Sequence, residues 1–183
     1  MQQEAEDLFD RMRKNRDIST DTNYWVNYAT FLMTTLARPD DARALLQRAT
    51  QSLPTHQHSH IISRFGALEY QSLHGDVERG RTVFEGLIDA HKNGFDLWDQ
   101  YVAQEMSLTN GDRGDADHVR RLFERMSKTK MKPKRAKFIF KKWLEWEKGL
   151  VEQGKGSDRN LANVKTLAEE YVERQGLKKG LDM

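Results

Sequence analysis

The chain has 183 residues, of which 37% are hydrophobic and 32% are charged, and it contains three prolines and no cysteine. The lack of cysteine excludes disulfides, thiolate zinc sites and catalysis by a thiol. The net charge of +2 excludes binding to nucleic acid through the charge of the whole chain, and no apolar run approaches the ~18 residues of a membrane-spanning helix, so we expect no membrane partner.

Residues 1–14 form an acidic amphipathic segment in which Leu8 and Phe9 are preceded and followed by charged residues. A related order of small, charged and paired apolar residues recurs at 42–48, 80–85, 119–125 and 164–169. Each recurrence follows a segment with a second pattern, whereas residues 1–14 follow none. We therefore predict that residues 1–14 are the second helix of a truncated repeat.

The second pattern consists of an aromatic or apolar residue, an aromatic three positions later and usually a glutamate four positions after that. In chain order its members are Trp25–Tyr28–Leu32, Ile62–Phe65–Glu69, Trp98–Tyr101–Glu105 and Phe140–Trp143–Glu147. Offsets of three, four and seven place side chains on one face of a helix. Each member is therefore predicted to be the first helix of a helical hairpin.

Helix-breaking residues fall between these predicted helices. Asp40, next to Pro39, is the expected N-cap after the first turn, and Pro133 is expected to begin the fourth repeat. Residues 149–160 are predicted to form a longer polar turn inside that repeat. The predicted boundaries are 18–54 for repeat 1, 55–92 for repeat 2, 93–132 for repeat 3, 133–175 for repeat 4 and 176–183 for a tail.

Two interleaved patterns with one period indicate stacked hairpins, because a single hairpin cannot bury its apolar face and a stack shares one continuous core. The predicted fold class is all-α. It is an α-α superhelix, or solenoid, of about four helical hairpins plus an orphan N-terminal helix, in a single domain over residues 1–183.

The repeated residues have a structural and a functional interpretation. The aromatic rings could stack on RNA bases, but a position shared by every hairpin favours packing between helices. The glutamates could act in catalysis, but catalytic carboxylates converge in one pocket, so a periodic series is expected to meet second-helix arginines such as Arg81 or Arg120. The signature residues are Trp25, Tyr28, Phe65, Glu69, Phe84, Trp98, Tyr101, Glu105, Phe123, Phe140, Trp143 and Glu147. We expect no enzymatic activity, catalytic residue, cofactor, metal or small-molecule substrate.

Basic side chains gather in one stretch near the start of the fourth repeat. They are Lys128, Lys130, Lys132, Lys134, Arg135, Lys137, Lys141 and Lys142. Such a cluster can neutralise RNA phosphates, bind an acidic protein or simply keep a helix solvated. Trp146 lies outside the shared aromatic series and is expected to be exposed or to meet a partner. Together these residues are the candidate binding site for RNA or a protein partner.

The chain resembles the HAT (half-TPR) repeat family. Its third repeat carries Trp98, Tyr101 and Glu105, then R-x-L-F-E-R at 120–125 and finally Pro133, which match the W-x-x-Y-x-x-x-E signature and the second-helix motif of that family. The resemblance implies a scaffold that holds the partners of an RNA-processing complex together.

A narrower resemblance is to the large ribosomal RNA-processing proteins that carry an array of S1 domains (the family of ribosomal RNA-processing protein five and programmed cell death protein eleven). Residues 76–88, 96–102, 121–127 and 132–148 are similar to the C-terminal HAT region of that family. The resemblance implies a nucleolar scaffold in pre-ribosomal RNA processing and early small-subunit (18S) assembly, with S1 domains N-terminal to this segment in the parent chain.

The partners implied by this resemblance are ribosome-assembly proteins of the U3-containing particle, and pre-ribosomal RNA itself. Two alternatives stay open at this point. One is a HAT-repeat scaffold of a splicing or mRNA 3′-end processing complex. The other is a direct RNA-binding module that acts through residues 128–142.

Overall fold

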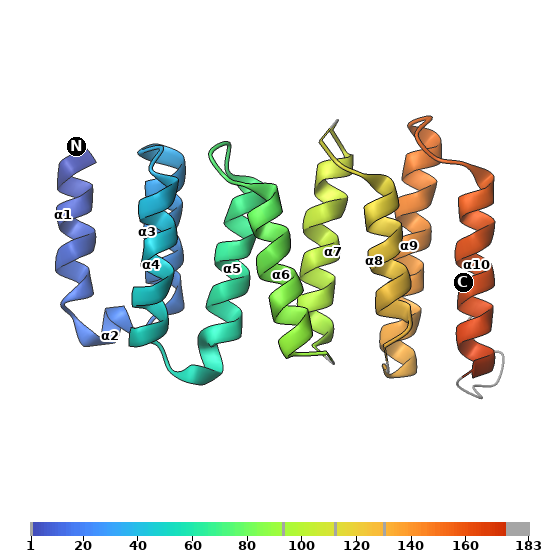
Figure 1. Ribbon diagram of the computed structural model, residues 1–183, viewed down its shortest axis with the longest axis horizontal. Helices are drawn as coiled ribbons and strands as arrows, with labels where there is room; N and C mark the ends of the chain where they lie inside the picture. Colours follow the sequence, from blue (N-terminus) through green and yellow to red (C-terminus); the bar gives the residue numbers. More distant parts are fainter. Residues whose placement is uncertain (1, 93, 112, 130, 175–183) are drawn as a thin grey trace. The chain divides into compact units, whose positions relative to one another are not determined.

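The computed structural model describes residues 2–92, 94–111, 113–129 and 131–174. Within these ranges the chain is helical and contains no strand, which confirms the predicted all-α class (Figure 1). The α-helices are α1 (Gln2–Arg13), α2 (Arg16–Ser19), α3 (Thr22–Thr30), α4 (Pro39–Ser52), α5 (His58–Gln71), α6 (Val77–Ala90), α7 (Phe95–Thr109), α8 (Ala116–Ser127), α9 (Pro133–Glu152) and α10 (Asp158–Arg174). A π-helical segment, η1 (Phe31–Thr35), continues α3, and a 3-10 turn, η2 (Thr55–Gln57), precedes α5. No described helix is long and apolar enough to cross a membrane.

Residues 1–104 form the first of two compact units. In this unit α3 and η1 run antiparallel to α4, and α5 runs antiparallel to α6, so each pair is a helical hairpin (Figure 1). Trp25, Ala29, Ile61 and Phe84 are buried in its core, and Phe9 of α1 packs against the same core. The first and second predicted hairpins are therefore present.

Residues 105–183 form the second unit. Here α9 and α10 make an antiparallel hairpin (Figure 1), and Leu122, Phe123, Phe140 and Tyr171 of α8, α9 and α10 are buried. The helix α7 begins in the first unit and ends in the second, and the loop after it leads into α8. Each predicted first and second helix is therefore found as a helix.

Polar side chains cap the N-termini of several helices. Asp76 accepts backbone hydrogen bonds of 3.0 and 3.2 Å at the start of α6, and Asp115 accepts one of 2.8 Å at the start of α8. Such caps satisfy N–H groups that have no partner within the helix. The prediction for Asp40 is wrong, because Arg38 is the N-cap of α4 and Pro39 is its first residue, a position where the missing N–H of proline has no cost.

The last hairpin has a longer helix and a shorter turn than predicted. The predicted turn over residues 149–160 is wrong at its start, because α9 continues through Gly149 and the connection to α10 covers only residues 153–157. Gly154 ends the helix with a positive φ of 70°. Its N–H and that of Lys155 bond back to carbonyls of the last turn at 2.9 and 2.8 Å, which is the bond pair of a Schellman C-cap.

The helices α5 and α6 approach each other closely because glycine lies on both facing surfaces. A Cβ atom at Gly80 would lie 2.5 Å from the ring of Tyr70, and one at Gly66 would lie 2.8 Å from Val83. Both distances are shorter than real carbon contacts, so a larger residue at either position would force the facing side chain or its helix to shift.

Candidate functional site

The signature aromatic rings stack between the second helix of one repeat and the first helix of the next. Phe84 of α6 stacks on Tyr101 of α7 with ring centroids 5.3 Å apart and planes 4° from parallel. Phe123 of α8 stacks on Trp143 of α9 at 5.1 Å and 5°. All four rings are buried, and pairs of this kind add about 0.5–1.5 kcal/mol beyond the area that they bury. These rings therefore pack at the interfaces between helices and do not form an open stacking surface.

The same contact recurs at the start of the chain. Phe9 of α1 stacks on Tyr28 of α3 at 4.5 Å and 6°, so α1 occupies the place of a second helix beside repeat 1. Tyr24 donates a hydrogen bond of 2.9 Å to the carbonyl of Phe9. Burial, together with the neighbouring Tyr28, raises the pKa of Tyr24 to about 12. The remaining signature rings, those of Trp25, Phe65, Trp98 and Phe140, are buried as well.

Glu147 is a buried anion held by an arginine of the neighbouring helix. Its two carboxylate oxygens accept hydrogen bonds from Nε and Nη2 of Arg120 at 2.7 and 3.0 Å. Asp117 binds the third guanidinium nitrogen at 2.7 Å. The bond to Glu147 is the main reason that the pKa of Arg120 is raised. Two parallel charged hydrogen bonds fix the orientation of α8 on α9.

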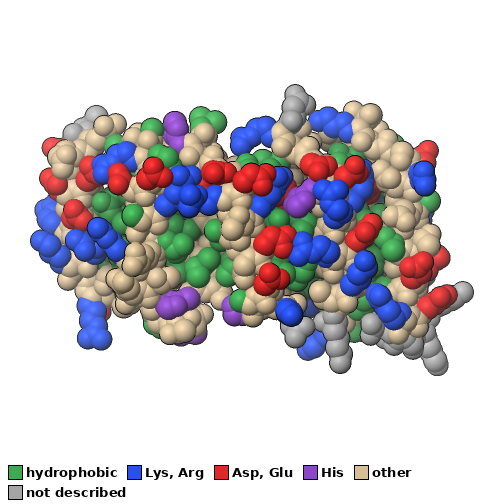
Figure 2. All heavy atoms as spheres, in the orientation of Figure 1, with side chains coloured by type: hydrophobic (Ala, Val, Ile, Leu, Met, Phe, Trp, Pro, Cys, Tyr) green, Lys and Arg blue, Asp and Glu red, His purple; other side chains and the backbone are tan. Residues whose placement is uncertain are grey.

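Glu69 in the first unit repeats this arrangement with Arg43, a second-helix arginine of α4. Nε and Nη2 of Arg43 donate to its carboxylate at 2.8 and 2.9 Å, and Asp40 binds Nη1 at 2.9 Å. Arg81, one of the two arginines that the sequence suggested as partners of the signature glutamates, contacts Glu78 within α6. The arginine comes from the second helix of the preceding repeat. Figure 2 shows acidic and basic side chains side by side over α4 and α6.

Glu105 is the third signature carboxylate, and its side chain is completely buried with Nε2 of His118 at 3.8 Å. Each signature glutamate thus has a basic side chain of a neighbouring helix beside it, which is an arrangement for packing rather than for a catalytic carboxylate pair. Over the residues that the structure describes, no group of three or more acidic or histidine side chains is placed to hold a metal ion.

Trp146 is buried, so the expectation that it is exposed is wrong. Only 8% of the residue is accessible, and its Nε1 donates to the hydroxyl of Thr109 at 3.1 Å. Its ring lies 6.1 Å from that of Phe123, and the guanidinium of Arg120 lies 5.7 Å from its centroid. Residues three positions apart share a helix face, which turns Trp146 inward beside Trp143.

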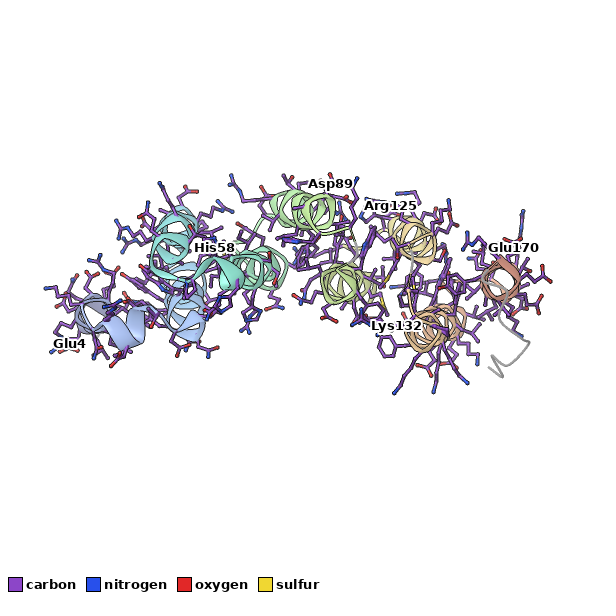
Figure 3. All side chains as sticks on the ribbon, turned by 90° about the horizontal axis from the view of Figure 1, so that it is seen from below. Glu4, His58, Asp89, Arg125, Lys132 and Glu170 are labelled. Atoms are coloured by element: carbon purple, nitrogen blue, oxygen red, sulfur yellow. The ribbon has the colours of Figure 1, made fainter. Side chains whose placement is uncertain are left out.

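The predicted basic stretch covers the α8–α9 turn and the outer face of α9. We call its described members the basic surface: Lys128, Lys132, Lys134, Arg135, Lys137, Lys141 and Lys142. All of them are exposed except Lys142, which is partly buried, and Lys130 lies outside the described residues. Figure 3 shows long side chains with nitrogen tips that fan out from α9, away from α8 and α10.

Few acidic groups oppose the basic surface. Glu147 points into the interface with Arg120, and the exposed Glu145 lies 3.8 Å from Nζ of Lys141. An exposed pair with this spacing contributes little to stability and leaves both groups open to other partners. The outer face of α9 therefore keeps a local excess of positive charge.

The sequence patterns missed Phe138, whose residue surface is 50% exposed within the basic surface. Nζ of Lys142 lies 6.0 Å from its ring centroid. Phe138 precedes the buried Phe140 by two positions, which is a rotation of about 200° around a helix. The sequence contains this two-position offset, but three consecutive apolar residues at 138–140 give no sign of which of them faces the solvent.

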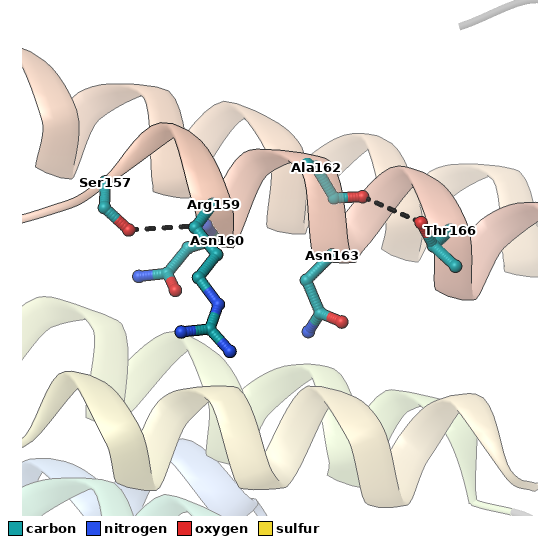
Figure 4. A pocket seen from close by; sticks show the side chains of 6 residues that line it. All are labelled: Ser157, Arg159, Asn160, Ala162, Asn163 and Thr166. Atoms are coloured by element: carbon teal, nitrogen blue, oxygen red, sulfur yellow. Dashed lines mark hydrogen bonds between the residues drawn. The ribbon is translucent and has the colours of Figure 1, made fainter.

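A shallow hollow lies on the first half of α10 (Figure 4). It is lined by Ser157, Arg159, Asn160, Ala162, Asn163 and Thr166. Ser157 accepts a bond of 3.4 Å from the N–H of Asn160, and Thr166 donates one of 3.2 Å to the carbonyl of Ala162. These bonds belong to the helix itself. With one cation, no carboxylate and no nucleophile beside a base, the hollow offers no catalytic group.

Two comparisons with known proteins found sequences that are similar to this chain. The family model described as PRP39 N-terminal HAT repeat matches residues 63–167. The rRNA biogenesis protein rrp5 of Schizosaccharomyces pombe is 42% identical over 148 residues, which cover 81% of this chain and 8% of that protein. The protein RRP5 homolog of Mus musculus is 33% identical over 93% of this chain and 8% of its own length.

The human relative is similar to the chain over a comparable share of its length. The protein RRP5 homolog of Homo sapiens is 35% identical over 79% of this chain and 7% of its own length. The chain therefore spans less than a tenth of the length of these relatives, and the similarity concerns one segment of each of them.

Proposed function

Because the chain belongs to the HAT-repeat family and is similar over most of its length to RRP5 proteins, we propose that it is a non-catalytic scaffold in pre-ribosomal RNA processing. The observation that carries this proposal is the burial of the signature residues. Their rings and carboxylates are buried at the interfaces between helices. They therefore hold the stacked helices together and leave the outer helix faces for partners. Stacked repeats with solvated outer faces are suited to hold several partners at once.

The finer parts of the proposal concern the partners and the place of the chain in the cell. The relative from Schizosaccharomyces pombe is an rRNA biogenesis protein by name, which supports partners among ribosome-assembly proteins and a place in the nucleolus. We place the chain in early small-subunit (18S) assembly, in the particle that contains U3, within a parent chain that carries S1 domains on the N-terminal side. Pre-ribosomal RNA is a further proposed partner.

Co-precipitation of RNA tests the scaffold proposal against its main alternative. The tagged chain is expressed in cells and precipitated from nuclear extract, and the recovered RNAs are quantified. We expect U3 and precursors of 18S RNA to be enriched over spliceosomal RNAs and pre-mRNA. Enrichment of spliceosomal RNAs or of pre-mRNA instead would contradict the proposal and favour a HAT-repeat scaffold of a splicing or mRNA 3′-end complex.

A second candidate function, direct RNA binding, is favoured by the basic surface. Its exposed cations are concentrated on one turn and one helix face, and such local density can neutralise several phosphates although the whole chain is nearly neutral. Reversal of Lys132, Lys134, Arg135 and Lys137 to glutamate should abolish salt-sensitive binding to a pre-ribosomal RNA fragment, measured by fluorescence anisotropy. Unchanged binding in this variant would contradict a role of the basic surface.

A further inference from the structure

We infer that the outer face of α9 binds single-stranded RNA, with a base stacked on Phe138 and phosphates on the lysines around it. This inference rests on the proposed role in pre-ribosomal RNA processing and names the form of RNA that the chain takes. It assigns binding to a residue that the repeat signature does not contain, because Phe138 belongs to neither of the two patterns.

Phe138 is half exposed although the two residues that follow it are buried. Ile139 and Phe140, the next two residues, are each 1% exposed and supply the packing of this turn of α9. Half of the surface of Phe138 is left in water, so the residue lacks part of the stabilisation that full burial of a phenylalanine gives. Leu8 and Leu73 are the other large hydrophobic side chains exposed in the described part of the chain, and Phe138 alone among the three is aromatic.

The helix geometry surrounds the ring of Phe138 with cations. Lys134 precedes it by four positions, and Lys141 and Lys142 follow it by three and four, which are the spacings of neighbours on a helix surface. The side chain of Lys141 is 68% exposed, and Nζ of Lys142 lies 6.0 Å from the ring centroid. A base stacked on the exposed part of the ring would therefore bring its phosphates within reach of several ammonium groups.

The lysines also follow a line along the helix. Lys134, Lys141 and Lys148 are exposed and are spaced seven residues apart, so they share one face over a length of about 21 Å. The carboxylate of Glu145 interrupts the line beside Lys141. A row of cations of this length suits an extended phosphate backbone better than a single anion.

The ring favours an unpaired strand over the other occupants of a cationic face. In an RNA duplex the bases are stacked on one another and present only their edges, whereas the π-faces of unpaired bases are free to stack on a protein ring. An acidic peptide would satisfy the lysines but would gain from Phe138 only apolar contact. The combination of a half-exposed ring and flanking lysines therefore fits single-stranded RNA best.

Matched RNA ligands and Phe138 variants test this inference on the 183-residue chain. A labelled single strand of about ten nucleotides is compared with its duplex by anisotropy, using the chain, Phe138→Leu and Phe138→Trp. Phe138→Leu keeps an apolar side chain and loses the π-face, so single-strand affinity should fall roughly tenfold. The affinity for the duplex and the binding of the single strand to Phe138→Trp should stay unchanged.

Raising the salt concentration from about 50 to 200 mM should weaken single-strand binding about fiftyfold if four phosphates are neutralised. Leu73→Ala, at an exposed leucine in the first unit, is the matched control and should bind like the chain.

Tryptophan fluorescence reports stacking directly. The four native tryptophans, Trp25, Trp98, Trp143 and Trp146, are all buried, so the exposed indole of Phe138→Trp should be the one that a bound single strand quenches. Equal affinity of Phe138→Leu and the chain, or no additional quenching in Phe138→Trp, would overturn the inference even if RNA binds through the lysines. Binding of an acidic peptide without any binding of RNA would overturn it too. The co-precipitation of U3 is independent of these results, so failure here is distinguishable from failure of the scaffold proposal.

Discussion

At the scale of single residues, the buried glutamates decide how the helices fit together. A carboxylate without a partner in a protein interior costs several kcal/mol, whereas one that is paired and hydrogen-bonded is tolerated. Glu69 and Glu147 each receive two hydrogen bonds from an arginine of the preceding repeat. The pair contributes specificity, because only one register of the two helices brings the fork and the carboxylate together.

Removal of the arginine should therefore cost more than removal of the charge on the glutamate. Arg120→Met leaves the 1% exposed carboxylate of Glu147 without its cationic partner, and we expect a loss of about 3 kcal/mol in the free energy of unfolding. Glu147→Gln leaves Arg120 with Asp117 and should cost about half as much. Urea denaturation measures both values, with Arg121→Met on the exposed side of α8 as the control. Equal losses in the three variants would contradict this account.

Tyr24 predicts a sensitivity to alkaline pH. Its pKa is raised from 10 to about 12 in the folded chain, first by burial, so the unfolded chain loses the phenol proton at a lower pH than the folded chain does. The contribution is fully present below pH 10 and is lost as pH rises through 12. The melting temperature should fall between these values less steeply for Tyr24→Phe than for the unchanged chain. Parallel pH profiles for the two proteins would rule out this contribution.

At the scale of helices, the length of α9 shows why boundaries are harder to predict than helices themselves. Gly149 and the glycines after it indicated a turn, but Gly149 meets no atom within 4 Å of an added Cβ position and simply lies in the helix. A solvent-facing glycine costs a helix only about 1 kcal/mol, which the packing of Leu150 in the core outweighs. The helix ends instead at Glu152, and Gly154, two residues later, takes the positive φ that closes its C-cap.

Two glycines of α6 should respond in opposite directions to the same substitution. An alanine Cβ at Gly80 would lie 2.5 Å from Tyr70, whereas one at Gly86 meets nothing within 4 Å. We expect Gly80→Ala to lower the free energy of unfolding by about 1–3 kcal/mol through overpacking, and Gly86→Ala to raise it by about 0.5–1 kcal/mol. Thermal unfolding followed by circular dichroism measures the two shifts. A stabilising Gly80→Ala would mean that α5 and α6 are not packed as closely as described.

At the scale of the whole molecule, a chain of repeats is stabilised by each repeat and by its contacts with its neighbours. A local change should therefore act locally. We expect Arg120→Met to lower the hydrogen-exchange protection of α8 and α9, which its bonds join, and to leave that of α3 and α5 unchanged. Gly80→Ala is the converse control, because it should lower the hydrogen-exchange protection of α5 and α6 and leave that of α8 and α9 unchanged. Uniform loss of protection along the chain in both variants would indicate global cooperativity and contradict this expectation.

The sequence by itself determined the fold class, the hairpin order and the buried character of the signature residues. It did so because helical periodicity and turn residues are local, and a period repeated along the chain leaves few arrangements that bury the apolar face. The same periodicity placed the basic stretch on a turn and one helix. For these features no knowledge of distant contacts was needed.

Only the tertiary structure decided which arginine holds which glutamate, that Trp146 is buried against Thr109 and Phe123, and that Phe138 is exposed among lysines. Each of these depends on which helix packs beside which, and on the rotation of each helix about its own axis. A shift of one or two positions around a helix turns a side chain from core to water. The arrangement of the proposed binding face therefore could not be derived from the sequence patterns alone.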